Sequence, residues 1–272
     1  MVIFPRAKIN LGLFVTEKRG DGYHNLESVF YPVGLSDVLE FIVPVKDPGR
    51  DILEITGIEI EGNTDDNLII KALSVLREKC SIPHLSIHLH KLIPTGAGLG
   101  GGSSDAASFL KVLNRYFCMA FSDDELREVA LRIGSDCPFF IDSRPAFATG
   151  RGEILKPLPE VLNGKFIVIL KPGKAVSTRE AYSGMIPLKR DIDLPSVYLG
   201  DTGKWKDILI NDFEKKISSV IPEITLIKNS LYDIGAFYSS MTGSGSAVYG
   251  IFSSPPAIPE SLIKYFTWAG YL

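Results

Sequence analysis

The sequence has few cysteines and no long apolar run. Its 272 residues include only three cysteines, Cys80, Cys118 and Cys137, which stand far apart. An odd number of separated cysteines makes a poor disulfide framework and contains no C-x-x-C pair. Nowhere do about 18 uncharged apolar residues follow one another, as a membrane-spanning helix requires, and the first residues lack the regions of a signal peptide. We therefore expect a reducing, cytoplasmic location.

The sequence also lacks a strong excess of charge. Lys and Arg total 29 and Asp and Glu total 32, which gives a formal net charge of −3 and a pI of about 5.9. A field of this size does not attract nucleic acid or an anionic membrane, so we expect neither as a partner. Apolar residues make up 45% and charged residues 22%, which allows a packed core and excludes wholesale disorder. We expect a monomer or a homodimer.

The first half of the chain has the pattern of strands followed by helices. Alternating apolar residues and turn-rich breaks predict strands at Ala7–Thr16, Glu27–Phe30, Val38–Val43 and Ile52–Ile60. Asn67 lies where the N-cap of the next predicted helix falls. Helical periodicity and capping signals predict helices at about 68–79, 104–116 and 123–133, with a further strand at 85–89.

The second half repeats this mixture of elements after a proline-rich stretch. Leu155–Pro159 reads as a domain boundary, so we expect an N-terminal domain at 1–154 and a C-terminal domain at 155–272. Strands are predicted at 165–170, 237–241 and 247–252, and helices at 211–220, 222–234 and after Pro259. Strands and helices occur in runs without strict alternation, which favours two domains of the α+β class.

A glycine-rich segment between a predicted strand and a predicted helix is the most informative part of the sequence. Five glycines fall between Gly96 and Gly102. Glycine lets the backbone approach a ligand closely, and the positive end of the following helix dipole favours anions. The segment therefore predicts a phosphate-binding loop, formed by Pro94, Thr95, Gly96, Ala97, Gly98, Leu99, Gly100, Gly101, Gly102, Ser103 and Ser104.

Four interpretations of this segment are possible. A P-loop requires a lysine before the hydroxyl residue, and Gly102-Ser103 has none. The spacing of Gly96, Gly98 and Gly101 matches a dinucleotide fingerprint, but the preceding strand alternates and no acidic strand end follows about 20 residues later. A flexible linker would not lie so closely between a strand and a helix. The interpretation we favour is the phosphate loop of a small-molecule kinase.

Three segments resemble the motifs of one enzyme family. Pro94–Ala107 is similar to the ATP-binding motif of the kinases named after galactose, homoserine, mevalonate and phosphomevalonate, the GHMP kinases. Arg6–Leu11 resembles the first motif of that family and Thr242–Val248 its third. Arg6 stands where a small or apolar residue is usual, which affects only local packing.

Four further segments resemble the members of this family that act on a cytidine-diphosphate-linked alcohol. They are Asp21–His24, Gly134–Phe140, Thr149–Glu153 and Asn211–Glu214, and they occur in the family's order over most of the chain. The combination is specific, although each segment alone is weak. The resemblance implies a two-domain fold with the active site in the cleft between the domains. It also implies transfer of phosphate from ATP with Mg²⁺ to the tertiary 2-hydroxyl of 4-diphosphocytidyl-2-C-methyl-D-erythritol, a step of non-mevalonate isoprenoid synthesis.

The resemblance also implies the roles of particular residues. Asp136 is expected to be the base for the acceptor hydroxyl and Lys8 the cation that stabilises the developing charge, which is what phosphoryl transfer requires. On chemistry alone, Asp136 is equally compatible with a turn aspartate, and Lys8 with a solvated lysine on an edge strand. Near Mg²⁺ we expect Ser103 or Ser104 and no cage of protein ligands.

The remaining expected contacts are looser. Tyr23 and His24 are expected to bind cytosine, because an aromatic face stacks a pyrimidine and an imidazole can hydrogen-bond its edge. Without the resemblance, Tyr23 is interpreted as an ordinary turn residue and Tyr182 as an aromatic residue of the core. The further candidates for the acceptor are Asn10, Tyr182, Thr242, Gly243 and Ser244, and those for the adenine are Asn67, Leu68 and Lys91.

Three other functions remain open at this point. A sister kinase for homoserine or mevalonate would not need the Asp21–His24 segment, since those substrates carry no cytosine. A nucleotide-binding module without catalysis would not need Lys8 or Asp136, and a dinucleotide oxidoreductase would consume NADH. His88 and His90 face the same side of a strand, but with no neighbouring cysteine or carboxylate in sequence we expect them to lie on a solvent face.

Overall fold

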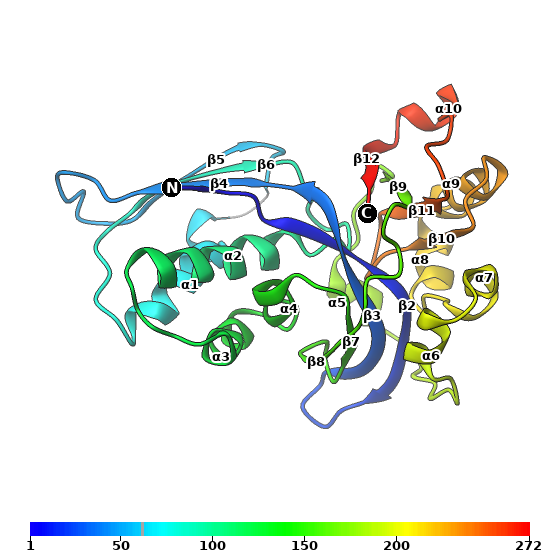
Figure 1. Ribbon diagram of the computed structural model, residues 1–272, viewed down its shortest axis with the longest axis horizontal. Helices are drawn as coiled ribbons and strands as arrows, with labels where there is room; N and C mark the ends of the chain where they lie inside the picture. The colour runs from blue at the N-terminus through cyan, green and yellow to red at the C-terminus, as the bar shows by residue number, and fades with distance from the viewer. Residues whose placement is uncertain (61–62) are drawn as a thin grey trace. The chain divides into compact units, whose positions relative to one another are not determined.

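The computed structural model describes residues 1–60 and 63–272 (Figure 1). The described chain forms two compact units, each built from several segments. The first unit comprises Met1–Ala7, Leu35–Thr95 and Gly100–Ser143, and the second comprises Lys8–Gly34, Gly96–Leu99 and Arg144–Leu272. The glycine-rich segment thus begins and ends in the first unit, whereas its middle, Gly96–Leu99, belongs to the second.

The first unit contains a four-stranded sheet covered on one face by helices. The strand order is β1 (Val2–Ile3), β4 (Val38–Ile42), β6 (Ser86–Lys91) and β5 (Ile52–Gly57), with β5 parallel to β6 and the other pairs antiparallel. Alternate residues are buried, as a sheet with one covered face requires. Figure 1 shows α1 and α2 on that side of the sheet.

Two helices of the first unit begin at capping residues that the sequence predicts. A short 3₁₀ turn, Thr64–Asp66, leads into α1 (Leu68–Arg77), and the Asn67 side chain caps α1 by accepting a hydrogen bond from the Ile69 N–H at 2.9 Å. The others are α2 (Gly101–Tyr116), α3 (Asp123–Ile133) and α4 (Cys137–Asp142). Ser122 and Glu125 form the predicted capping box of α3.

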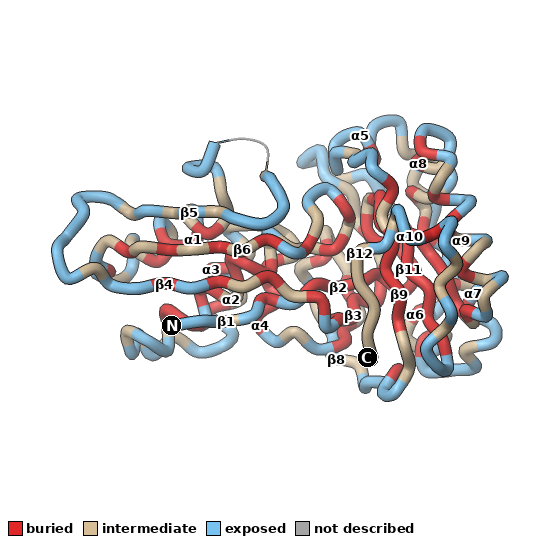
Figure 2. The backbone as a smooth tube through the Cα atoms, turned by 90° about the horizontal axis from the view of Figure 1, so that it is seen from above, coloured by how far each residue is buried: buried red, intermediate tan, exposed pale blue. Residues whose placement is uncertain are grey.

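The second unit contains two four-stranded sheets. One has the order β2 (Arg6–Lys18), β3 (His24–Ser36), β7 (Ala146–Thr149) and β8 (Ile154–Pro157). The other is antiparallel, with the order β10 (Tyr238–Met241), β11 (Val248–Phe252), β9 (Phe166–Leu170) and β12 (Phe266–Tyr271). Figure 2 shows β9 and β11 buried along most of their length, as expected for central strands.

Six helices complete the second unit. They are α5 (Thr178–Tyr182), α6 (Leu194–Leu199), α7 (Trp205–Ile208), α8 (Glu214–Val220), α9 (Glu223–Asp233) and α10 (Glu260–Ile263). Apolar side chains of α8 and α9, such as Ile217, Ile224 and Ile227, join a core cluster with Val168 of β9 and Val248 of β11. This core holds the strands that carry the third glycine-rich motif.

The sequence prediction of the α+β class is confirmed, and most of the predicted elements occur in the structure. The sequence did not predict β1, β7, β8, β12 or the helices α4 to α7. The proline-rich stretch after Ile154 contains strand β8, which pairs with β7; Pro157 is tolerated because β8 is an edge strand. The last helix, α10, has only four residues, and the edge strand β12 follows it. Of the helices in the described part of the chain, none has the length and apolar character needed to cross a bilayer.

Candidate active site

The glycine-rich segment forms a sharp loop that requires glycine at defined positions. Gly96, Gly98 and Gly100 have φ angles of 60°, 75° and 72°, in the left-handed region. At Gly98 a Cβ would also lie 2.0 Å from the carbonyl oxygen of Thr242. Neither constraint is compatible with a side chain, which explains the composition of the segment.

The helix that follows the loop presents unpaired backbone donors. Gly100 is the N-cap of α2 and provides no side-chain hydrogen bond to the first turn. The first N–H groups of a helix have no partner within the helix, and the dipole makes this end positive. A phosphate group would fit the start of α2.

The third glycine-rich motif packs against the middle of this loop within the second unit. Thr242 Oγ1 donates a hydrogen bond to the Gly98 carbonyl oxygen at 3.2 Å, and the Ala247 N–H donates to the Ala97 carbonyl oxygen at 3.2 Å. Gly243 has a φ of 55°, and a Cβ there would lie 2.8 Å from the Gly98 carbonyl oxygen. Ser244 lies nearby, with its Oγ 3.4 Å from Thr178 Oγ1. The two glycine-rich motifs thus form one backbone assembly.

Lys8 and Asn10 extend this assembly along β2. The Lys8 N–H donates to the Leu99 carbonyl oxygen at 3.0 Å, and the Lys8 ammonium donates to Asn10 Oδ1 at 2.7 Å. The Asn10 N–H donates to Thr242 Oγ1 at 3.1 Å, and Asn10 Nδ2 donates to Ser28 Oγ at 2.8 Å. Both Lys8 and Asn10 are almost fully buried, so this lysine is not a solvated residue of an edge strand.

The Asn211–Glu214 motif supports the third loop, a role that sequence reasoning missed. Asn211 Nδ2 donates hydrogen bonds to the Met241 and Gly243 carbonyl oxygens at 2.8 and 2.9 Å. Glu214 Oε2 accepts a hydrogen bond from the Met241 N–H at 3.0 Å. From sequence position alone, a side chain that hydrogen-bonds to buried backbone groups looks the same as one that binds a ligand. This is why the role was not predicted.

Asp136 lies at the start of α4 in the first unit. It is the N-cap residue of α4, but its carboxylate makes no capping hydrogen bond. The side chain is partly exposed, whereas the next residues, Cys137 and Pro138, are buried. Burial raises the pKa of the Cys137 thiol to about 12, against the opposing effect of a hydrogen bond with the Ser103 hydroxyl. That thiol is therefore protonated at neutral pH, and Asp136 is the partly exposed carboxylate beside it.

The aromatic residues expected at the cytosine lie in the second unit. The rings of His24 and Tyr182 are stacked, with centroids 4.9 Å apart and planes inclined by 25°. The rings of Phe213 and Tyr182 form an edge-to-face contact, with centroids 4.8 Å apart. Tyr23 is 54% exposed, with the Arg151 guanidinium carbon 4.7 Å from its ring centroid. Tyr23 thus has an aromatic surface open to a ligand.

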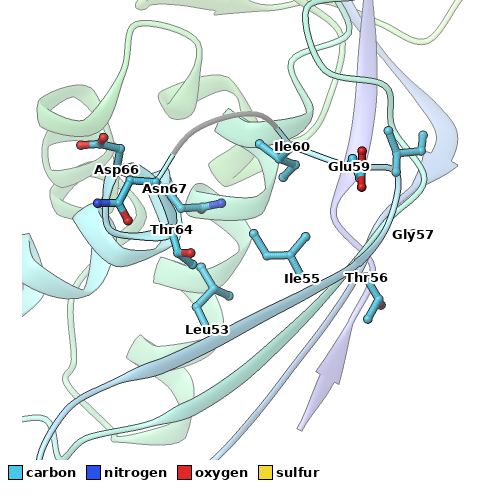
Figure 3. A pocket seen from close by; sticks show the side chains of 11 residues that line it. Leu53, Ile55, Thr56, Gly57, Glu59, Ile60, Thr64, Asp66 and Asn67 are labelled. Carbon is cyan, nitrogen blue, oxygen red and sulfur yellow. The ribbon is translucent and has the colours of Figure 1, made fainter.

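A pocket in the first unit lies beside Asn67. It has a volume of about 550 Å³ and is bordered by the end of β5 and the turn before α1. Figure 3 shows aliphatic side chains of Leu53, Ile55 and Ile60 and the polar side chains of Thr64 and Asn67 around it. The lining combines four aliphatic residues with six polar ones, including Glu59 and Asp66. It therefore offers a heterocyclic base both apolar contacts and hydrogen-bonding groups.

Leu68 connects this pocket to the glycine-rich segment. Leu68 follows Asn67, and a Cβ at Gly102 would lie 3.7 Å from Leu68 Cδ1, within ordinary contact distance. Leu68 is therefore next to the first turn of α2. The first unit alone thus contains both this pocket and the uncapped start of α2.

Lys91 occupies a different place from the one expected for a residue that lines the adenine site. Its side chain is 1% exposed and its ammonium donates hydrogen bonds to Asp37 Oδ2 and, at 2.9 Å, to Asp105 Oδ2. Desolvation raises the pKa of Asp105 above its usual range, and the attraction of the Lys91 ammonium opposes this shift. The Lys91 side chain therefore lies inside the unit, beneath the start of α2.

The comparisons with known proteins agree with this geometry. The family profile "GHMP kinases N terminal domain" matches residues 67–144 and "GHMP kinases C terminal" matches residues 194–266, together more than half of the chain. The class of protein is therefore that of the GHMP kinases.

Relatives within this class define the family more closely. The 4-diphosphocytidyl-2-C-methyl-D-erythritol kinase of Bacteroides thetaiotaomicron is 48% identical over 96% of this chain and 95% of its own. That of Parabacteroides distasonis is 44% identical over the full length of both chains. A crystal structure of a 4-(cytidine 5'-diphospho)-2C-methyl-D-erythritol kinase has a TM-score of 0.80 and 31% identity, covering 99% of this chain and 98% of that one. The chain belongs to the 4-diphosphocytidyl-2-C-methyl-D-erythritol kinase family.

The structures of more distant kinases share the fold alone. The Methanococcus jannaschii mevalonate kinase has a TM-score of 0.69 at 14% identity. The expected two-domain α+β fold of the GHMP kinases is confirmed by both the profiles and the structures.

Proposed function

We propose that this chain transfers the γ-phosphate of ATP to the 2-hydroxyl of 4-diphosphocytidyl-2-C-methyl-D-erythritol, with Asp136 as the base and Lys8 as the charge stabiliser. The observation that carries the proposal is the loop from Gly96 to Gly102, whose backbone conformation and uncapped helix end fit the phosphates of ATP. Membership of this kinase family supplies the reaction and the acceptor.

We assign the adenine to the pocket beside Asn67 and the phosphates to the start of α2. Asn67 uses its Oδ1 to cap α1, which leaves its Nδ2 group available to a base. Leu68 joins the pocket to Gly102, so one nucleotide can occupy both places without a break. The backbone from Pro94 to Ser104 would then surround the phosphate chain.

We assign the acceptor to residues of the second unit. Tyr23 offers an exposed ring for cytosine, and His24, stacked on Tyr182, offers ring nitrogens that can read a base edge. Asn10, Thr242, Gly243 and Ser244 belong to the hydrogen-bonded assembly around the glycine loops. They would hold the diphosphate or the polyol of the acceptor.

Asp136 and Lys8 would carry the chemistry. An ionised Asp136 can accept the proton of the attacking hydroxyl, so that the new O–P bond forms as the bond to the ADP oxygen breaks. Lys8, fixed by Asn10 Oδ1 at 2.7 Å, would place a positive charge where the transferred phosphate develops negative charge. Because Lys8 is already held by the protein, this charge requires little reorganisation during the reaction.

We also propose Mg²⁺ as the metal that accompanies ATP. Within residues 1–60 and 63–272, no group of three or more His, Cys, Asp or Glu side chains can hold a metal ion. Ser103, in the first turn of α2, is partly exposed, whereas the Ser104 hydroxyl is buried and has no hydrogen-bond partner. These residues fit a Mg²⁺ ion held mainly by phosphate oxygens and water, with Ser103 as the favoured protein ligand. When bound, the ion would neutralise phosphate charge.

The division of function between residues 1–154 and 155–272 remains part of the proposal. It is supported by the two family profiles, which end at residue 144 and begin at residue 194. The N-terminal part would supply most of the ATP site, and the C-terminal part Tyr182 and the third glycine loop.

The decisive experiment measures ADP release with ATP and Mg²⁺ for four alcohols: 4-diphosphocytidyl-2-C-methyl-D-erythritol, mevalonate, homoserine and galactose. We expect strong turnover of the cytidine compound alone. Turnover of another alcohol instead would retain the phosphate loop but contradict the assignment of Tyr23 and His24. ATP binding without any turnover would contradict the catalytic roles of Lys8 and Asp136.

A further inference from the structure

A buried cluster of three charged residues lies behind the phosphate loop in the first unit. Asp37, between β3 and β4, and Asp105, in α2, both receive hydrogen bonds from the Lys91 ammonium at the end of β6. All three side chains are at most 3% exposed. No ligand role accounts for them, because none of them reaches the surface.

The cluster connects the two ends of the glycine-rich segment. Asp37 Oδ1 accepts hydrogen bonds from the N–H groups of Leu92 and Ile93, at 2.6 and 2.8 Å, where the chain leaves β6 for the loop. Asp105 lies one helical turn after Gly101, where the chain leaves the loop. Lys91 joins these two carboxylates and so closes the loop at its base.

Close packing at Gly101 shows that the Lys91 side chain contacts the start of α2 directly. A Cβ at Gly101 would lie 3.2 Å from the Lys91 Nζ and 2.8 Å from Ile93 Cγ2. The first turn of α2 therefore rests on the Lys91 side chain. A shift of that ammonium would move the N–H groups of Gly101 and Gly102, which we assign to the phosphates.

Stability alone is a poor explanation for this cluster. Burying three ionisable side chains costs solvation free energy. Apolar residues of similar volume often replace buried ion pairs with no loss of stability. Asp105 Oδ1, moreover, is buried without a hydrogen-bond partner, so the carboxylate is not fully satisfied. Directional hydrogen bonds do fix an orientation, which apolar packing specifies less sharply.

We propose that Lys91 and Asp105 are positioning residues for ATP. Their ion pair links the two ends of the glycine-rich segment, and it fixes the first turn of α2 in the orientation that binds the phosphates. The proposal rests on the assignment of the phosphates to this helix end. A loop that is already ordered loses less conformational entropy on binding, so the pair should affect nucleotide affinity more than the chemical step.

The test compares substitutions at Asp105 with one elsewhere in the same helix. Asp105→Ala removes the link, Asp105→Asn retains an oxygen acceptor for Lys91 in a side chain of the same size, and Leu113→Ala removes buried packing about two turns further along α2. Isothermal titration calorimetry with ADP gives the affinity. Steady-state kinetics separates the KM for ATP from kcat, and urea unfolding gives the stability of each variant.

We expect Asp105→Ala to raise the Kd for ADP and the KM for ATP by about 10-fold, with kcat at saturating substrates within about 3-fold of the wild type. Asp105→Asn should recover part of the affinity. Leu113→Ala should lose comparable stability but keep both constants within about 2-fold. If Asp105→Ala does not fold, Asp105→Asn alone decides, with an expected increase of about 3-fold.

Two results would overturn the inference. One is unchanged nucleotide affinity in folded Asp105 variants, and the other is an equal loss of affinity in Leu113→Ala, which would reduce the cluster to a structural role. A wild-type protein that does not bind ADP would instead contradict the proposed function, so the two failures are distinguishable.

Discussion

The guanidinium group of Arg151 lies over the ring of Tyr23, with its carbon 4.7 Å from the ring centroid. Arg151 belongs to the Thr149–Glu153 motif, and its backbone N–H and Nε face Glu153. Arg151 therefore covers one face of the tyrosine ring, and cytosine would stack on the other. Its remaining donors suit the diphosphate of the acceptor.

The first prediction concerns this arginine. Arg151→Ala should raise the KM for the cytidine substrate by about 10-fold, leave kcat within about 3-fold and leave the KM for ATP unchanged, because a charge-assisted contact to the acceptor is lost. Inhibition by CDP should weaken more than inhibition by cytidine, which has no phosphate. The control is Lys156→Ala on β8, an exposed cation of the same unit. Equal weakening of CDP and cytidine would show that Arg151 only supports the tyrosine ring.

A second prediction concerns the proposed catalytic residues. Asp136→Ala and Lys8→Ala should each lower kcat by about 10²- to 10⁴-fold, since each removes a group that acts on the transition state. Lys8→Met fills the buried volume and serves as the matched variant where the alanine variant is unstable. Circular dichroism and the KM for ATP report whether the fold and the nucleotide site persist. Nearly wild-type turnover in both alanine variants would contradict the assignment.

A third prediction concerns Asn211, which donates to two backbone carbonyls of the third glycine loop. Asn211→Ala leaves buried acceptors without partners and should lower the free energy of unfolding by about 2 kcal/mol or more. Asn163→Ala, at an exposed position, should change it by less than about 0.5 kcal/mol. Urea denaturation of both variants measures the difference, and equal stabilities would show that the loop does not depend on Asn211.

Much of the fold and the candidate site was predictable because it depends on local signals. Alternating apolar residues gave most strands, and the Asn67 cap and the Ser122–Glu125 box gave two helix starts correctly. The glycine-rich segment was recognisable because left-handed φ angles and close backbone approach both select glycine. Apart from the close approach of Gly98 to Thr242, these features involve residues that are neighbours in the chain.

The features that the sequence did not predict depend on contacts between distant residues. The sequence predicted Lys91 as a pocket residue. Its ion pairs with Asp37 and Asp105 could not be predicted, because these partners lie 54 and 14 residues away in the chain. Asn211 supports a loop more than 30 residues later in the chain. Strand β12 was missed since its pairing with β9, about 100 residues away, is what stabilises it.

A fourth prediction uses the close approach between Gly98 and Thr242. In Gly98→Ala the new Cβ would lie 2.0 Å from the Thr242 carbonyl oxygen, at a residue with a φ of 75°. The loops must separate, so we expect the KM for ATP to rise by at least about 10-fold and the melting temperature to fall. Gly20→Ala, where no atom lies within 4 Å and φ is not positive, is the matched control. A Gly98→Ala protein with wild-type nucleotide affinity would contradict the assigned role of this loop.

The last prediction concerns pH and the stacked pair of His24 and Tyr182. Burial, and then the charge of Lys18, lower the pKa of His24 below its usual value of 6.5. His24 is therefore neutral at pH 7, and a neutral ring has a nitrogen that can accept a hydrogen bond from the cytosine amino group. As the pH falls through the pKa of His24, the imidazolium forms, that acceptor is lost, and kcat/KM for the cytidine substrate should fall.

His24→Gln separates this effect from other titrations, because glutamine offers an acceptor that does not titrate. The ratio of the wild-type kcat/KM to that of His24→Gln should be constant at neutral and alkaline pH and should decrease in the acid range below about pH 6.5. Groups that titrate in the same way in both proteins cancel in this ratio. A ratio that stays constant down to about pH 5 would show that His24 does not use its neutral nitrogen to bind the substrate.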